Sequence, residues 1–330
     1  MSTPLLEVEG LVVRYPISRG LVGSVARQPR RFVQAVSGVS FTVDRGELVA
    51  LVGESGCGKT TTAQAVLRLV DADAGSIRLD GVDVTALAPK ALRALRRRMQ
   101  IIYQDPYESL DPRFRVRTTV EEPLSVHRIG SRAEREVAVT RALELAGLEP
   151  PELFLDRYPH ELSGGQRQRV AIAASLALGP ELLVADEPVS MLDVSVRAGI
   201  LAVLDDLRRR GLGILMITHD LSTAARFADR IAVMYLGRIV EAGPARAVID
   251  DPQHPYTKAL LAVVPRRDPR HRTRATILRG ETPNPIDVPP GCRFHPRCPV
   301  AIEACRSHDP ALEPAGATAA HRAACLLAGR

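Results

Sequence analysis

The spacing of apolar and polar residues divides the chain into β-rich and helical stretches. Residues 5–52 alternate apolar and polar positions, with a turn signal at residues 44–46, and predict an antiparallel β layer that leads into a buried strand. Residues 76–84 predict a hairpin that turns at Asp80 and Gly81. The amino-terminal part of the protein is therefore expected to be largely β-structure.

Helical periodicity fills the middle of the chain. Residues 133–146 and 165–178 predict two amphipathic helices, the first of which ends at Gly147. Glycine commonly follows the last turn of a helix because it adopts the left-handed conformation without strain. These helices indicate a helical subdomain inserted at about residues 106–178.

Short apolar strands alternate with helices after this insertion. The apolar run before Asp186 suits a strand buried on both faces of a parallel sheet. Residues 194–210, 213–218 and 221–228 predict helix, strand and helix in turn. This alternation indicates a βαβ core, and together with the β layer and the insertion it predicts an α/β fold with a mixed β core.

The βαβ pattern ends near residue 244, so we expect three regions. Residues 1–250 form the main domain. Residues 251–290 contain a short helix, predicted at 256–264, and a linker rich in proline and arginine. Residues 291–330 form a small carboxyl-terminal extension that carries cysteines.

Composition limits the location and the partners of the protein. Hydrophobic residues make up 45% of the 330 positions, but the longest uncharged apolar stretch, residues 170–178, is about half of what a membrane span needs. The net charge of +6 permits an acidic partner. Because the arginine-rich pieces have helical spacing and aromatic residues are few, we expect solvated helix faces and no nucleic acid. Five cysteines indicate a cytosolic protein without a disulfide framework.

A phosphate-binding loop follows the first buried strand. Residues 53–60 fit G-x-x-x-x-G-K-[ST], in which the glycines let successive N–H groups face phosphate oxygens and a helix N-terminus adds its dipole. Lys59 is predicted to reach the β- and γ-phosphates, and Thr60 to hold Mg²⁺. We therefore expect ATP and Mg²⁺ as ligands. The predicted nucleotide-binding residues here are Gly53, Ser55, Gly56, Cys57, Gly58, Lys59, Thr60 and Thr61.

Two carboxylates end the apolar strand before residue 188. Asp186 is placed to hold Mg²⁺ beside Thr60. Glu187 follows it, and neighbouring side chains on a strand point apart, so its carboxylate can face the γ-phosphate. That position suits a general base for an attacking water.

Residues 162–166, Leu-Ser-Gly-Gly-Gln, predict a second anion site. Ser163 can cap the next helix while Gly164 and Gly165 expose N–H groups, and Gln166 completes the motif. This motif, about a hundred residues beyond the phosphate loop, resembles the signature of the ATP-binding subunits of ABC transporters. The resemblance covers residues 5 to about 245.

The resemblance implies further roles, and an ABC-type P-loop NTPase fold. Gln104 is similar to the Q-loop glutamine that contacts Mg²⁺, Asp193 lies in a segment like the D-loop, and His219 resembles the switch histidine. Tyr15 is the candidate for stacking on adenine. Two such subunits would meet head to tail, with each ATP between one phosphate loop and the other subunit's signature. Glu187 and His219 would then be catalytic, and Thr60, Gln104 and Asp186 would hold Mg²⁺.

Three further segments resemble the ATPases of oligopeptide, dipeptide and nickel importers. They are residues 103–112, 186–195 and 254–261. The resemblance implies import of peptides, driven from the cytoplasmic face of the membrane. It also implies a second, different ATPase subunit, two transmembrane permease subunits and an extracytoplasmic binding protein. Alternatives are a nickel or other solute importer, or a soluble ABC protein acting on ribosomes or DNA.

Four of the five cysteines lie in the last forty residues. Four thiolates can hold an iron-sulfur cluster or tetrahedral zinc, although the spacing lacks the C-x₂-C pair of zinc ribbons. Plain reduced thiols are the third possibility, and His295, His308 or His321 could substitute as zinc ligands. The peptide-importer resemblance favours a [4Fe-4S] cluster. The four residues are Cys292, Cys298, Cys305 and Cys325.

Overall fold

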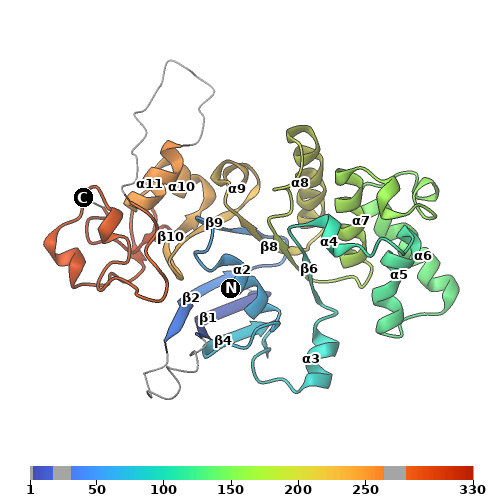
Figure 1. Ribbon diagram of the computed structural model, residues 1–330, viewed down its shortest axis with the longest axis horizontal. Helices are drawn as coiled ribbons and strands as arrows, with labels where there is room; N and C mark the ends of the chain where they lie inside the picture. Colours follow the sequence, from blue (N-terminus) through green and yellow to red (C-terminus); the bar gives the residue numbers. More distant parts are fainter. Residues whose placement is uncertain (1–2, 18–30, 264–279, 330) are drawn as a thin grey trace.

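The computed structural model describes residues 3–17, 31–263 and 280–329, and it contains two β-sheets (Figure 1). The larger sheet has eight strands in the order β11-β12-β10-β9-β3-β8-β7-β6, and the smaller has the order β2-β1-β4-β5. The larger sheet comprises β3 (Leu48–Val52), β6 (Met99–Ile102), β7 (Leu182–Asp186), β8 (Gly213–Thr218), β9 (Arg230–Tyr235), β10 (Arg238–Pro244), β11 (Glu313–Pro314) and β12 (Arg322–Ala323).

The centre of the large sheet is parallel and buried on both faces. Strands β3, β6, β7, β8 and β9 run parallel, and every residue of β3, β7 and β8 is buried. Successive side chains alternate between two hydrophobic cores: Leu183 packs in one, and Leu182 and Val184 pack in the other. This explains why these strands read as continuous apolar runs. The expected α/β fold is confirmed.

Helices cover both faces of this sheet (Figure 1). One core contains residues of α5, α7, α8 and α9, and the other contains residues of α2 and of the smaller sheet. The helices are α2 (Lys59–Val66), α3 (Pro89–Leu95), α4 (Pro106–Ser109), α5 (Val116–Val126), α6 (Arg132–Leu145), α7 (Gly164–Leu176), α8 (Val194–Arg209), α9 (Leu221–Phe227), α10 (Ala245–Asp250) and α11 (Pro255–Ala262), with single 3-10 turns at Pro151–Leu153, Pro159–Glu161, His295–Arg297 and Glu303–Arg306.

The smaller sheet is the antiparallel layer predicted from residues 5–52. It comprises β1 (Leu6–Pro16), β2 (Phe32–Val43), β4 (Ala74–Leu79) and β5 (Val82–Asp83), and the last two form the predicted hairpin. Asp80 and Gly81 both have positive φ, as the two-residue turn requires. The sheet brings Tyr15, at the end of β1, close to the loop before α2.

The helical subdomain lies at one end of the molecule, and the carboxyl-terminal extension lies at the other (Figure 1). Helices α4 to α7 come between β6 and β7, within the range expected for the insertion. Ser131 begins α6 with a capping box, in which its side chain accepts the Glu134 N–H and the Glu134 carboxylate accepts the Ser131 N–H. No helix in the described ranges is long and apolar enough to cross a membrane.

The extension continues the large sheet instead of standing apart from it. Strand β12 pairs antiparallel with β10 and with β11. A buried ion pair lies at this junction, where His321 Nε2 is 2.7 Å from Glu241 Oε1. The predicted linker at 265–290 falls partly outside the described residues, and its described part lies against β2, where the Gln34 N–H donates to the Pro285 carbonyl at 3.0 Å. The extension and the main domain therefore share one core.

Candidate functional site

The phosphate loop is the turn between β3 and α2. Gly58, the residue before the helix, has φ of 104°, and a Cβ there would lie 2.1 Å from the Ala35 carbonyl oxygen. A Cβ on Gly53 would lie 2.2 Å from the Met234 carbonyl oxygen. Only glycine fits at either position, because a real Cβ does not approach an oxygen that closely. The loop is thus folded tightly against β2 and β9.

The Lys59 ammonium is held by the loop itself. It donates to the carbonyl oxygens of Gly53 and Glu54 at 2.7 and 2.9 Å, and it lies 3.8 Å from the Cys57 sulfur. Burial raises the pKa of the Cys57 thiol. Cys57 is therefore a neutral, small side chain that fills the space under the loop, and Lys59 is poised beside the N-terminus of α2.

Asp186 and Thr60 meet at the edge of the loop. The Thr60 hydroxyl donates to Asp186 Oδ1 at 3.4 Å. Asp186 is only 5% exposed, and burial, together with the charge of Glu187, raises the pKa of its carboxyl. A divalent cation bound between the two side chains would offset this cost of burying a carboxylate.

Glu187 is at the centre of a small polar cluster. Its Oε2 atom lies 3.1 Å from His219 Nδ1 and accepts a hydrogen bond of 3.4 Å from Gln104 Nε2. Glu187 also has φ of 46°, which is uncommon for a residue with a side chain. The turn after β7 thus aims the carboxylate away from the strand and towards His219, which follows β8. The three side chains come from three separate connections.

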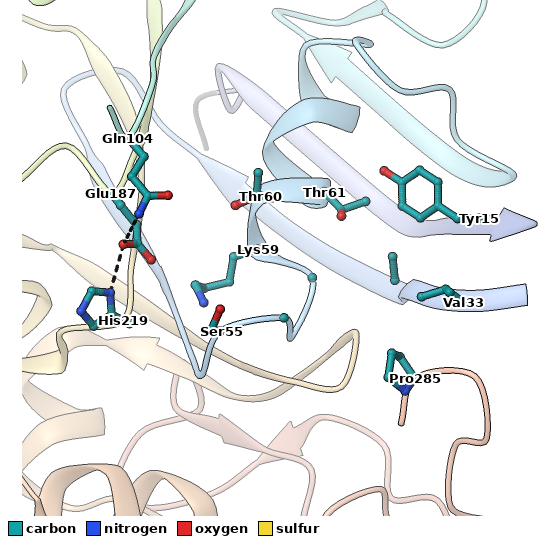
Figure 2. A pocket seen from close by; sticks show the side chains of 13 residues that line it. Tyr15, Val33, Ser55, Lys59, Thr60, Thr61, Gln104, Glu187, His219 and Pro285 are labelled. Carbon is teal, nitrogen blue, oxygen red and sulfur yellow. Dashed lines mark hydrogen bonds and ion pairs between the residues drawn. The ribbon is translucent and has the colours of Figure 1, made fainter. Parts of the chain in front are cut away.

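These groups line one cavity of about 620 Å³. Figure 2 shows Gln104, Glu187 and His219 on one side of it, Lys59 and Ser55 in the middle, and Tyr15, Val33 and Pro285 on the other side. The polar side suits the terminal phosphate, and the apolar side suits a base. The predicted nucleotide-binding residues that line the cavity are Tyr15, Ser55, Gly56, Gly58, Lys59, Thr60, Thr61 and Gln104, and both predicted catalytic residues, Glu187 and His219, line it as well. Gly53, Cys57 and Asp186 do not line it.

The signature residues lie elsewhere on the described surface. Ser163 caps α7 and forms a capping box with Gln166, whose N–H donates to Ser163 Oγ at 3.3 Å while its side chain accepts the Ser163 N–H. Gly164 and Gly165 form the first turn of α7, and a Cβ on Gly165 would collide with Val196. None of these residues, nor Asp193 at the start of α8, lines the cavity of Figure 2. One chain therefore carries two separate parts of the expected site.

On the apolar side of the cavity, the sequence analysis predicted Tyr15 but missed its neighbours. Val33 and Ala35 belong to β2, and Pro285 belongs to the segment interpreted as a linker. None of these three residues belongs to a sequence motif that would have indicated a role in the site. Glu54, read only as a variable position of the phosphate loop, makes contacts with the extension.

The four carboxyl-terminal cysteines lie in one region of the extension. The Cys292 N–H donates to the Cys305 carbonyl at 2.9 Å. Burial raises the pKa of Cys292 to about 11, and the neighbouring thiols Cys305, Cys298 and Cys325 add to the effect. Over the described residues, no three His, Cys, Asp or Glu side chains converge closely enough to hold a single metal ion.

Two family models match this chain. Residues 36–190 match the ABC transporter family, and residues 240–305 match the carboxyl-terminal region of oligopeptide/dipeptide transporters. The first match spans the phosphate loop, the signature and Glu187. The second spans α10, α11 and three of the four clustered cysteines.

Similar proteins align over nearly the whole chain. A Sinorhizobium fredii protein described as "probable peptide ABC transporter ATP-binding protein y4tS" is 46% identical over 95% of this chain and 88% of its own length. The dipeptide transport ATP-binding protein DppF of Haemophilus influenzae is 44% identical over 94% of each chain.

Solved cassettes share the fold. A dimeric post-hydrolysis structure of the ATP-binding cassette MJ0796, bound to ADP and phosphate, is 28% identical with a TM-score of 0.63, over 73% of this chain and 99% of that chain. The cbiO1 cassette from Clostridium perfringens gives a TM-score of 0.65 at 29% identity, over 76% of this chain and 92% of that one.

Proposed function

The chain belongs to the ATP-binding proteins of ABC transporters, and from this premise we propose that it is the ATP-hydrolysing subunit of a peptide importer. The observation that carries the proposal is the cavity in which the phosphate loop, Glu187 and His219 converge. Asp186 contacts this site through the Thr60 hydroxyl. Relatives that align over almost the full chain are described as peptide and dipeptide transport proteins.

The phosphate side of the cavity binds the triphosphate through the loop and Lys59. Lys59 leaves the Gly53 and Glu54 carbonyls and turns to the β- and γ-phosphates, while the N–H groups of the loop face the phosphate oxygens. Thr60, Asp186 and Gln104 would hold Mg²⁺, which neutralises charge on the phosphates when it is bound. The raised pKa of Asp186 fits this role, because a buried carboxylate without a cation is unfavourable.

Glu187 serves as the general base. Its carboxylate faces the cavity and contacts His219, so it can accept a proton from a water beside the γ-phosphate. His219 keeps the carboxylate oriented and reaches the γ-phosphate. Gln104 completes the cluster and connects it to the exposed loop after β6.

The signature of a second ATPase subunit closes the site. Ser163, Gly164, Gly165 and Asp193 lie outside this chain's cavity, while the similar MJ0796 cassette is described as a dimer. The N-terminus of α7 presents backbone N–H groups beside an exposed Ser163, which suits a phosphate of the partner's nucleotide. The γ-phosphate then holds two subunits together, and its loss lets them separate.

The complete transporter contains a second, different ATPase, two transmembrane permeases and an extracytoplasmic binding protein. This subunit then sits peripherally on the cytoplasmic face of the membrane. Transport relatives imply permease partners, and the exposed side chains Tyr103 and Met191, which line a hollow with Gln104, offer a surface for them.

Reconstitution of this chain with its partner subunits in liposomes tests the function. Wild type should couple ATP hydrolysis to uptake of labelled di- and oligopeptides, and Glu187→Gln should bind ATP yet lose at least roughly a hundredfold in turnover. Glu144→Gln, on the exposed face of α6, is the matched control and should transport normally. Unchanged turnover in Glu187→Gln would exclude it as the base. Uptake of Ni²⁺ without peptide would assign a different cargo.

The four clustered cysteines are proposed to bind a [4Fe-4S] cluster. Burial chiefly, with the neighbouring thiols of Cys305, Cys298 and Cys325, raises the pKa of Cys292, and metal ligation stabilises such thiols as thiolates. Anaerobically purified protein should be brown, with roughly four iron atoms per chain. Cys325→Ser should lose the iron, and Cys57→Ser, outside the group, should keep it. Colourless, iron-free wild type would refute the cluster.

A further inference from the structure

The carboxyl-terminal extension reaches the phosphate loop through Arg297. Its guanidinium forms two contacts with the Glu54 carboxylate, from Nη1 to Oε2 at 2.8 Å and from Nη2 to Oε1 at 3.2 Å. Thr282, in the described part of the linker before the extension, donates to Glu54 Oε2 at 2.7 Å. The Arg297 side chain is 9% exposed and that of Glu54 is 28% exposed. This pairing is sheltered and bidentate, which distinguishes it from an ordinary surface ion pair.

Glu54 is also held through its backbone. Its N–H donates to the Tyr256 hydroxyl of α11 at 3.0 Å, and its carbonyl accepts from Lys59 at 2.9 Å. The residue that contacts Lys59 is therefore fixed by two elements from beyond residue 250. Burial opposes ionisation of Glu54, but the hydrogen bonds from Arg297 and Thr282 outweigh it and lower the pKa of the carboxyl.

The described part of the linker that precedes the extension forms a wall of the cavity. Pro285 lies on the side of Tyr15 and Val33, as Figure 2 shows, and the Gln34 N–H fixes its carbonyl at 3.0 Å. The extension thus touches the site at the loop that binds phosphate, and the linker before it touches the apolar side that suits the base.

We propose that the segment from residue 280 onwards, which is the described part of the linker together with the extension, is part of the nucleotide site. We further propose that Arg297 is a positioning residue that neutralises Glu54 and so sets the affinity for the triphosphate. The proposal rests on the proposed function, since it assigns ATP to this cavity. A carboxylate in the phosphate loop repels the phosphates and competes for Lys59 unless a cation pairs with it. Arg297 provides that cation from 243 positions away in the sequence.

Titration of the full-length chain with a fluorescent ATP analogue tests the proposal. Arg297→Met should weaken binding roughly tenfold, within the range measured for residues in one ion-pair network. Glu54→Gln should bind at least as tightly as wild type. The double variant should return to within about twofold of wild type, because no unpaired carboxylate remains. A purely structural role for Arg297 would leave the double variant as weak as Arg297→Met.

Control variants distinguish the effect of the Arg297 charge from a loss of packing and from a failure of the proposed function. Arg297→Lys keeps the charge and should recover part of the affinity, and thermal unfolding checks that each variant folds. Asp309→Ala removes another ion pair between extension and main domain, with Arg238, and should bind ATP as wild type does. If Arg297→Met binds ATP as tightly as wild type, or if the double variant binds as weakly as Arg297→Met, the inference about Arg297 is wrong while the proposed function still stands. Failure of wild type to bind ATP would instead overturn the proposed function.

Discussion

Replacement of His321 by alanine should destabilise the whole protein, because the side chain pairs with a buried carboxylate. His321 and Glu241 are 1% and 0% exposed, and their facing atoms lie 2.7 Å apart. The carboxylate also accepts the N–H groups of Gln253 and His254 at 2.7 and 2.9 Å. Removing the imidazole therefore leaves a buried charge with two of its three partners.

The loss in free energy of unfolding comes from the removal of one charge-assisted contact and one buried ring. Removing one partner of a buried pair costs about 3 to 5 kcal/mol. The entropy of unfolding is about 2.1 cal/mol/K per residue. Dividing the free-energy loss by this entropy for 330 residues predicts a melting temperature lower by roughly 4 to 7 °C if the chain unfolds cooperatively.

Scanning calorimetry of full-length protein measures this directly. His308→Ala is the matched control, because His308 is exposed in the same extension, and its melting temperature should stay within about 1 °C of wild type. If His321→Ala also melts within that margin, the pair does not stabilise the junction between β10 and the extension, and the reasoning is refuted.

Two further predictions concern charge and stacking. Arg98 chiefly, with Arg45, lowers the pKa of Glu181 to about 2 from 4.5, so the ionised carboxyl stabilises the fold above pH 4.5 and loses this effect as the pH falls through 2. Glu181→Gln should therefore unfold at lower denaturant than wild type at pH 7, with the difference shrinking below pH 4.5. Tyr15→Ala should weaken ATP binding roughly tenfold and Tyr15→Phe should not, if the Tyr15 ring, which lines the cavity, stacks on adenine as proposed.

Local pattern predicted the parts of the fold that depend on neighbouring residues. The apolar run before Asp186 is β7, and the signature serine caps α7 as its sequence suggested. A strand buried on both faces of a parallel sheet requires a continuous apolar run, and a helix cap requires a residue such as serine, so both can be recognised in the local sequence. The same holds for the tight phosphate loop, where Gly58 has a conformation that other residues avoid.

Contacts between segments far apart in the sequence could not be predicted from local sequence patterns. Pro285 sits in a stretch whose proline content suggested a linker, yet its carbonyl pairs with β2. Arg297 and Glu54 are each unremarkable polar residues in sequence, and only the folded chain brings them together. The convergence of Gln104, Glu187 and His219 was predicted through family resemblance, since three separate loops supply them.

The pairing of β10 with β12 has a practical consequence for dissecting the protein. A chain shortened after residue 250 would lose β11 and β12, exposing the backbone edge of β10. It would also lose Gln253, His254 and His321, so that the interior carboxylate of Glu241 would have none of its present partners. An open strand edge beside an unpaired internal charge favours self-association. A fragment that keeps the pairing of β10 with β12 and all three partners of Glu241 therefore extends to at least residue 323.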